Sequence, residues 1–383
     1  MPFQPTRARR WAPPGLALSL AFFHAAQAQV GAAVSDVPAS EVTLPALTVT
    51  AQQAPTVGQS DTASEGAVGR SQLASRPLLR PAEVLAAVPG VVVAQHSGDG
   101  KANQYYLRGF NLDHGTDFAT FVDGMPINMP THAHGQGYTD LNFLIPELVQ
   151  VIRYRKGPYA AEEGDFASAG SARIQLVNNL PEGLASATVG PHQYGRVVLA
   201  NSVALPTGRL LYAAEGAHNN GPWQQPEGFS RFNGLLRYSL NQGGVQQSLT
   251  AMLYTAHWRS TDQVPQRAVD AGLVDRYGAI DPTDHGRSDR ASLSWQAVGL
   301  LDDGEWRAQA YAIRSRLDLY SNFTYELDNP SDLGSARQGD QFDQAETRVV
   351  YGGGVSRTWQ HGSEALPGSV TLGAQWRHDH VAP

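Results

Sequence analysis

The sequence predicts an α+β domain at residues 76–180, followed by antiparallel transmembrane β-strands at residues 181–383. Three observations lead to this fold class. Short β-prone runs separated by glycine and proline fill residues 76–180. After residue 181, apolar and polar residues alternate over stretches long enough to cross a membrane as strands. No apolar run of about 18 residues follows the N-terminus, which argues against a helical membrane protein.

Composition narrows the function classes. Glycine (39 residues) and proline (24 residues) indicate many turns, and only 16% of the residues are charged. The net charge of −7 argues against a nucleic-acid partner. The chain has no cysteine, which excludes thiol catalysis, cysteine zinc sites and a disulfide scaffold.

Residues 1–28 have the pattern of a secretory signal peptide. Arg7, Arg9 and Arg10 form a positive region, residues 16–23 an apolar core, and residues 26–28 a small-x-small cleavage pattern. We therefore expect export to the periplasm or the cell outer membrane.

Residues 29–75 are rich in small and polar residues and predict a flexible periplasmic tether. Within it, residues 44–51 are β-prone and uncharged, so their backbone could pair with the sheet edge of another chain. An ordinary linker that happens to contain valine and threonine is the alternative.

The elements of the α+β domain follow from local signals. Proline at the start and Pro89-Gly90 at the end predict a short helix at residues 81–88. Asp123-Gly124 between two apolar runs predicts a hairpin turn. A helix fragment is expected at residues 140–147. Strands are expected at residues 91–93, 105–110, 149–155 and 173–177.

Alternation predicts the strands of the second part. At residues 231–240, Phe232 and Leu236 belong to an apolar face, and Arg231 and Arg237 to a polar face. Residues 306–320 change parity midway, which predicts a bulge or a long strand leaving the membrane. Residues 262–289 and 322–342 are expected to be long outward loops. Trp223, Trp258, Trp306, Trp359 and Trp376 suit interfacial girdles. The other alternating stretches are residues 197–205, 245–253, 291–301 and 370–377.

Taken together, the sequence resembles a TonB-dependent outer-membrane receptor over its entire length. Residues 81–93 are similar to the "xxEVLxxxPGV" opening of that family's plug domain, and residues 122–126 to its "VDGxP" strand. Residues 107–109 and 144–158 resemble its arginine-glycine and "IPxxxVxxIEVxxGP" elements. One segment of the predicted tether resembles the TonB box of that family. It consists of Leu47, Thr48, Val49, Thr50 and Ala51.

The departures from the family indicate a divergent subgroup. Gln150 and Arg153 replace the usual acidic residues, and residues 170–176 replace the glycine-pair element. The space before the TonB-box-like segment is too short for an extra signalling domain, which favours a transporter over a signalling transducer. About 22 strands would need more than residues 181–383, so we expect the N-terminal part of a barrel.

The resemblance implies a function and partners. A plug inside a β-barrel would bind a scarce extracellular ligand such as a siderophore, haem, cobalamin or a metal complex. The TonB-box-like segment would add as a strand to the periplasmic domain of TonB, which supplies the energy for import. The expected partners are therefore TonB, outer-membrane lipids and a small-molecule or metal-chelate ligand. Neither enzymatic activity nor a cofactor is expected.

Candidate ligand-binding residues follow the "VDGxP" strand. Two imidazoles in one loop could converge on a metal or metal chelate, with Asp140 or Met129 nearby. A polar loop whose histidines bond to neighbouring backbone is the alternative. The candidate metal ligands are His132 and His134. The candidate ligand-binding residues are His132, His134, Gln136 and Tyr138.

Other polar residues suggest weaker hypotheses. His114, Asp113 and Asp117 form a second polar loop, and His378-Asp379-His380 is interpreted as a solvated strand end. Arg108 and Arg155 are expected plug–barrel ion-pair partners, or else ordinary solvated arginines. Two other functions stay open. A passive porin would need neither tether nor plug, and a periplasmic metallohydrolase would need a third metal ligand and a general base.

Overall fold

The computed structural model describes residues 62–95, 97–322, 340–363 and 366–383. The predicted signal peptide and the TonB-box-like segment lie outside the described residues. Residues 53–383 form one compact unit. Among the described residues, no helix is long and apolar enough to cross a membrane.

The N-terminal domain, residues 62–180, contains a five-stranded sheet in the order β1-β7-β8-β5-β6. Only β5 and β8 pair in parallel, and a register shift at Val149 and Val151 interrupts the β7–β8 ladder. The strands are β1 (Glu65–Gly69), β5 (Phe118–Val122), β6 (Met125–Pro126), β7 (Val149–Arg155) and β8 (Gly170–Leu176).

A second, three-stranded sheet and several short helices complete this domain. The sheet has the order β2-β3-β4, formed by β2 (Val91–Ala94), β3 (Gln104–Leu107) and β4 (Phe110–Asn111). The predicted helix at residues 81–88 is the 3₁₀ helix η1 (Pro81–Ala87), where Glu83 accepts hydrogen bonds from backbone N–H groups before it. The expected fragment at residues 140–147 is reduced to η2. The remaining helices are α1 (Arg70–Ala74), η2 (Pro146–Leu148) and η3 (Ala161–Glu163).

Two turns show how backbone conformation limits the strands. Asp123 (φ 47°) and Gly124 (φ 74°) form the predicted hairpin between β5 and β6, with the left-handed conformations that a two-residue turn favours. The single strand expected at residues 105–110 is wrong. Arg108 (φ 51°) and Gly109 (φ 87°) turn the chain back, so β3 and β4 are two short antiparallel strands.

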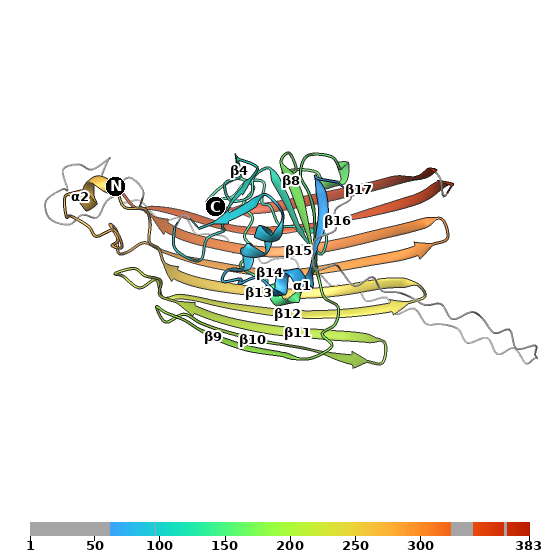
Figure 1. Ribbon diagram of the computed structural model, residues 1–383, viewed down its shortest axis with the longest axis horizontal. Helices are drawn as coiled ribbons and strands as arrows, with labels where there is room; N and C mark the ends of the chain where they lie inside the picture. Colours follow the sequence, from blue (N-terminus) through green and yellow to red (C-terminus); the bar gives the residue numbers. More distant parts are fainter. Residues whose placement is uncertain (1–61, 96, 323–339, 364–365) are drawn as a thin grey trace, which may run out of the picture. The chain divides into compact units, whose positions relative to one another are not determined.

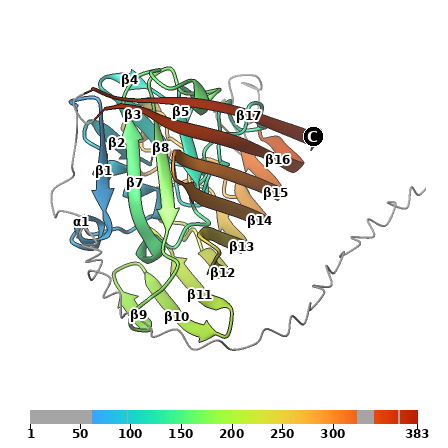
Figure 2. The same cartoon turned by 90° about the vertical axis from the view of Figure 1, so that its right-hand side faces the viewer.

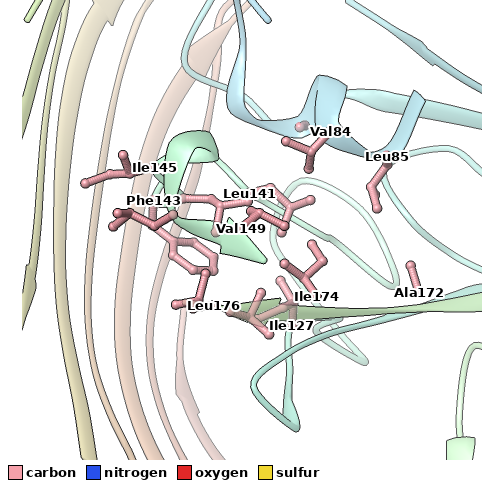
Figure 3. Packing of buried hydrophobic residues seen from close by; sticks show 14 of the residues in the cluster. Val84, Leu85, Ile127, Leu141, Phe143, Ile145, Val149, Ala172, Ile174 and Leu176 are labelled. Carbon is pink, nitrogen blue, oxygen red and sulfur yellow. The ribbon is translucent and has the colours of Figure 1, made fainter. Parts of the chain in front are cut away.

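Apolar side chains from helix η1, from the segment before η2 and from the five-stranded sheet form the core of this domain. Val84 and Leu85 of η1 are fully buried with Leu141 and with Ile174 of β8, as Figure 3 shows. Burying such a side chain stabilises a fold by about 1.5–3 kcal/mol. The core therefore supports the loops that follow β4 and β6.

The tether predicted for residues 29–75 ends earlier than expected. Residues of β1 pair antiparallel with β7 along its whole length, from Glu65 opposite Arg155 to Gly69 opposite Val151. Helix α1 follows directly, with Leu73 buried. Although residues 62–75 have little to bury, backbone pairing with an exposed sheet edge holds them in the domain.

Nine antiparallel strands form the second part of the chain in simple sequence order, from β9 to β17 (Figure 1). Figure 2 shows that β1, β7 and β8 run in a different direction from these strands. Helix α2 (Gln266–Asp270) lies between β13 and β14. The strands are β9 (Leu184–Val189), β10 (Gly195–Leu205), β11 (Gly208–Asn219), β12 (Phe229–Gln242), β13 (Val245–Arg259), β14 (His285–Leu301), β15 (Gly304–Ser321), β16 (Phe342–Ser363) and β17 (Leu366–Ala382).

The predicted alternation is confirmed in β12. Arg231 and Arg237 are buried, whereas Phe232 and Leu236 are exposed. The same pattern in β13 buries Thr250 and exposes Leu249. The polar face lies toward the N-terminal domain, and the apolar face points away from it, as a strand facing lipid requires.

The structure decides between two alternatives for one strand and corrects one expectation about a tryptophan. No register shift interrupts the pairing of β15 with β14 or β16, so the predicted bulge is absent there and the alternative, a long strand, is observed. Trp258 is only 3% exposed and packs against Gly100 of the N-terminal domain, so it is not an interfacial side chain. Trp376, by contrast, is exposed.

Candidate functional site

The predicted histidine loop, residues 129–138, is closed at its base by two backbone hydrogen bonds. Met129 N–H donates to the Tyr138 carbonyl at 3.1 Å, and Gly137 N–H donates to the Met129 carbonyl at 2.8 Å. Tyr138 is buried, and its hydroxyl accepts a hydrogen bond from Ala102 N–H at 2.9 Å. The loop is therefore fixed both to itself and to the segment before β3.

Aromatic and imidazole rings gather around Tyr138. The ring of His132 stacks on it at a centroid distance of 4.0 Å and an angle of 8°, and the ring of His134 meets it edge-on at 5.9 Å. His114, from the loop after β4, lies 4.7 Å from the His134 ring. The structure thus brings together three of the four predicted ligand-binding residues and adds His114. Gln136 is exposed at the edge of this imidazole cluster.

Burial keeps the imidazoles neutral. It lowers the pKa of His132 to about 3, with the Arg348 charge acting in the same direction. Burial also lowers the pKa of His134 to about 3, against the opposing effect of its hydrogen bond to Gln344. A neutral imidazole keeps one nitrogen lone pair for a donor or a metal ion.

The hydrogen bonds of His134 determine which nitrogen is free. Its Nδ1 lies 3.0 Å from the Gln344 side-chain oxygen, which can only accept, so Nδ1 must carry the proton. Its Nε2 is then an acceptor, and it is buried without a hydrogen-bond partner among the described residues. The Nδ1 of His132 is occupied, because it accepts from His134 N–H at 3.2 Å.

The histidine loop also docks on strand β16. Ala133 N–H donates to Glu346 Oε2 at 3.0 Å, and Gln344 Nε2 donates to the Ala133 carbonyl at 2.6 Å. Arg348 donates to the Thr131 carbonyl. A metal site in this loop would need further ligands, because no three His, Asp or Glu side chains within the described part of the chain are placed to hold a metal ion.

A cleft lies between this loop and strands β14 to β17. It is narrow, with a volume of about 30 Å³, and is partly open to solvent. The N-terminal domain contributes Ile127, Met129, His132, Tyr138 and Asp140, and the strands contribute charged side chains such as Arg290 and Glu346 beside apolar ones such as Ile313 and Val350. Burial raises the pKa of Asp140 to about 6.

One partly buried and one buried ion pair tie the N-terminal domain to the nine-stranded sheet, and the sequence reasoning missed both. Arg196 of β10 donates to both oxygens of Glu147, at 2.6 and 2.9 Å. Arg237 of β12 pairs with Asp123 in the hairpin turn, and both side chains are 4% exposed. Charged residues on the polar face of a predicted strand were the signal that could have found them.

The two arginines predicted to bridge domain and sheet make their contacts within the N-terminal domain. Arg155 pairs with Glu65, Glu162 and Glu163. Arg108 is exposed and donates to the Ala63 carbonyl at 3.4 Å. Arg155 has its acidic partners on its own domain and Arg108 bonds to a backbone carbonyl there, so their recorded contacts are not with the nine-stranded sheet.

A further contact involves the loop that precedes β3. Lys101 pairs with Asp262 at 3.2 Å, and both side chains are almost fully buried. Asp99 N–H donates to Glu227 Oε1 at 3.2 Å. The loops after β11 and β13 therefore hold residues 98–101 from the side.

The His378-Asp379-His380 triplet lies in β17, and Asp379 forms side-chain ion pairs there. Both histidines are exposed. Asp379 accepts hydrogen bonds from Arg348 at 2.7 Å and from Arg377 at 2.6 Å. The interpretation as a solvated strand end therefore holds for the two histidines but not for Asp379.

Comparison with known proteins agrees with this architecture. Residues 34–171 match the family model of the TonB-dependent receptor plug domain. The ferric-catecholate import receptor Fiu from E. coli K12 (open form) has a TM-score of 0.64 at 16% identity, covering 84% of this chain and 50% of Fiu. The siderophore receptor PiuA from Acinetobacter baumannii has a TM-score of 0.64 at 13% identity, covering 83% of this chain and 45% of PiuA.

A copper protein has a similar fold. The copper transporter OprC has a TM-score of 0.60 at 17% identity, covering 85% of this chain and 47% of OprC. The chain thus spans about half the length of these solved structures. At such identities the likeness concerns the fold, and the plug match identifies the domain. A domain that matches the plug model, followed by antiparallel strands with a polar face toward it, therefore gives this chain the fold seen in these solved structures.

Proposed function

We propose that the chain belongs to a transporter that binds a scarce extracellular ligand and passes it into the periplasm with energy supplied through TonB. Siderophores and metal chelates are the ligand classes that we favour. The names of Fiu, PiuA and OprC support this choice, because they describe a ferric-catecholate import receptor, a siderophore receptor and a copper transporter.

The observation that carries the proposal is the docking of the plug on the polar face of the sheet. The buried pair of Arg237 with Asp123 and the paired carboxylate of Glu147 hold the plug in place. Breaking a buried pair costs about 3–5 kcal/mol. A plug held by such contacts would move only when work is done on it, which favours an energised transporter over a passive pore.

The tether is the element through which this work would act. Residues 47–51 would add as a strand to the periplasmic domain of TonB, and backbone hydrogen bonds would supply the affinity. Force on the tether would first reach β1, which is paired with β7 at the edge of the five-stranded sheet.

Binding of TonB to the tether is the first test. We expect the exported full chain to bind the periplasmic domain of TonB and Val49→Pro to weaken binding by about tenfold or more, because proline removes a backbone donor. Val57→Pro, in the same tether but outside the segment, is the matched control. Equal binding by the chain and both variants would overturn the role of residues 47–51.

Ligand contact by the imidazole cluster is a separate part of the proposal. We propose that the free Nε2 of His134, together with His132 and Tyr138, contacts the ligand, while Gln136 lies at the rim. Calorimetry with Cu²⁺ and with a ferric catecholate chelate tests this. His132→Ala/His134→Ala should weaken binding, whereas the exposed pair His257→Ala/His380→Ala should not. Unchanged binding in the first variant would exclude contact at this cluster.

A further inference from the structure

Gln344 of β16 is the residue of the nine-stranded sheet that meets the His134 ring of the plug. Its side-chain nitrogen donates to the Ala133 carbonyl at 2.6 Å, and its side-chain oxygen lies 3.0 Å from His134 Nδ1. Two positions further along β16, Glu346 accepts a hydrogen bond from Ala133 N–H at 3.0 Å. Gln344 therefore contacts both the backbone and an imidazole of the histidine loop.

The Ala133 carbonyl determines the orientation of the Gln344 amide. A carbonyl oxygen can only accept, so the amide atom that lies 2.6 Å from it must be the nitrogen. The oxygen of the same amide then faces His134 Nδ1, and this oxygen can also only accept. The backbone of the loop thus sets the amide, and the amide sets the position of the proton on His134.

His132 carries its proton on the opposite nitrogen. Its Nδ1 accepts a hydrogen bond from the backbone N–H of His134 at 3.2 Å, so the proton of a neutral His132 lies on Nε2. Burial lowers the pKa of both rings to about 3 and keeps both neutral. The two imidazoles are therefore not equivalent, and of the two only His134 presents a lone pair at Nε2.

The surroundings of His134 Nε2 would not stabilise a proton there. Among the described residues this nitrogen is buried without a hydrogen-bond partner, beside the rings of His114 and Tyr138. A proton on Nε2 would be a buried donor without an acceptor, and the Nδ1 lone pair would then face the Gln344 oxygen. Both arrangements leave polar atoms unsatisfied, which costs free energy.

We propose that Gln344 is a positioning residue that holds the His134 proton on Nδ1, so that Nε2 keeps its lone pair while the plug is docked on β16. Because the two residues belong to the sheet and to the plug, movement of the plug away from β16 would remove this control. Use of the lone pair in ligand contact rests on the proposed function, whereas the position of the proton does not.

Two substitutions separate the acceptor of Gln344 from its donor. Gln344→Glu keeps an acceptor beside His134 Nδ1, whereas Gln344→Lys keeps a donor for the Ala133 carbonyl and has no acceptor. Nitrogen NMR of the full chain in detergent, labelled at histidine, shows which ring nitrogen carries the proton at about pH 8, where the imidazoles are neutral. The signals that disappear in His134→Ala identify this ring.

We expect a protonated Nδ1 in the unmodified chain and in Gln344→Glu, and a protonated Nε2 in Gln344→Lys. Gln360→Lys, which adds the same charge at an exposed position of β16, is the matched control and should keep the proton on Nδ1. A proton on Nε2 in the unmodified chain would overturn the proposal. An unchanged proton position in Gln344→Lys would overturn it as well.

A neutral variant keeps the test decisive if Gln344→Lys does not fold. Gln344→Leu removes the acceptor without adding a charge, so part of the His134 population should carry its proton on Nε2, and a proton that stays wholly on Nδ1 would overturn the proposal. Calorimetry with Cu²⁺ should show binding about tenfold weaker in Gln344→Leu than in Gln360→Leu. A shifted proton with unchanged Cu²⁺ affinity would confirm the role of Gln344 and contradict ligand contact by His134.

Discussion

At the scale of single residues, the approach between plug and sheet depends on side-chain size. Gly100 has φ of 95°, and a Cβ atom at this position would lie 2.2 Å from the Trp258 ring. Gly109 has a similar φ of 87°, but nothing lies within 4 Å of the position that its Cβ would occupy. Substitutions at Gly109 and Gly100 therefore distinguish the cost of backbone strain alone from the cost of strain with an added steric contact.

Substitution of these glycines should give different losses of stability. We expect Gly109→Ala to lower the free energy of unfolding by about 1 kcal/mol through backbone strain alone. For Gly100→Ala we expect a loss of roughly 2–4 kcal/mol, since overpacking against Trp258 is added to the strain. Thermal unfolding of the two variants measures the difference. Equal losses would show that residues 98–101 do not pack against Trp258.

The effect of Asp140 on the free energy of unfolding should depend on pH. Burial raises its pKa to about 6 in the folded protein, above the value of about 3.9 for an unfolded aspartate. Ionisation of Asp140 therefore opposes folding, and the penalty grows as the pH rises from about 4 to about 6.

The matching variant is Asp140→Asn, which cannot ionise. Relative to this variant, the unmodified chain should lose roughly 2–3 kcal/mol of unfolding free energy between about pH 4 and about pH 7, and little more above that range. Thermal unfolding over this pH range measures it, and Asp165→Asn, at an exposed site, controls for the loss of one carboxylate. A constant difference between the chain and Asp140→Asn would contradict a raised pKa.

At the scale of elements, strand β10 holds the plug through Arg196. This side chain pairs with Glu147 of η2 and, at 2.7 Å, with Glu215 of the neighbouring strand β11. Because Glu147 lies two residues before the start of β7, the contact holds the start of that strand against the nine-stranded sheet.

Loss of this arginine should loosen the start of β7. We expect Arg196→Gln to speed hydrogen exchange at residues 146–151 by about tenfold, since it removes a bidentate, charge-assisted pair that solvent screens only in part. Mass spectrometry of exchanged peptides measures this rate. Arg307→Gln, at an exposed pair on β15, should leave it unchanged. Protection that is the same in both variants would exclude a role of Arg196 in holding the plug.

The alternation of the strands can be predicted from the sequence, whereas the ion-pair partners of their side chains cannot. The alternation that places Arg237 on the buried face of β12 is local, so the sequence alone predicts it. The partner of Arg237 is Asp123, far away in the chain, and no local pattern specifies such a pairing. The prediction for Arg155 was wrong for the same reason. One of its partners is Glu65, which lies in a segment that was interpreted as tether.

In the histidine loop, too, the local features can be predicted from the sequence and the contacts with distant segments cannot. His132 and His134 were recognised from their spacing, and Tyr138 from the loop that contains them. Their approach to His114 depends on a turn in another part of the plug, so no local pattern predicts it. Sequence also cannot reveal that the proton of His134 lies on Nδ1, since this follows from the position of Gln344.

At the scale of the whole molecule, the position of the plug against the nine-stranded sheet is the central feature. The plug docks on the polar face of the nine-stranded sheet, and the proposed transport depends on that boundary. The histidine loop meets β16 through Ala133 and Gln344, which gives a contact between two segments more than 200 positions apart.

Crosslinking across this contact is the most direct measurement. The chain has no cysteine, so Ala133→Cys/Gln344→Cys creates a single pair. In outer-membrane fractions this pair should be crosslinked efficiently by a short bis-maleimide, whereas Tyr159→Cys/Gln344→Cys, with an exposed plug position, should not. Crosslinking of neither pair, or a plug released into the soluble periplasmic fraction after cleavage of the linker to β9, would contradict a plug docked on the sheet.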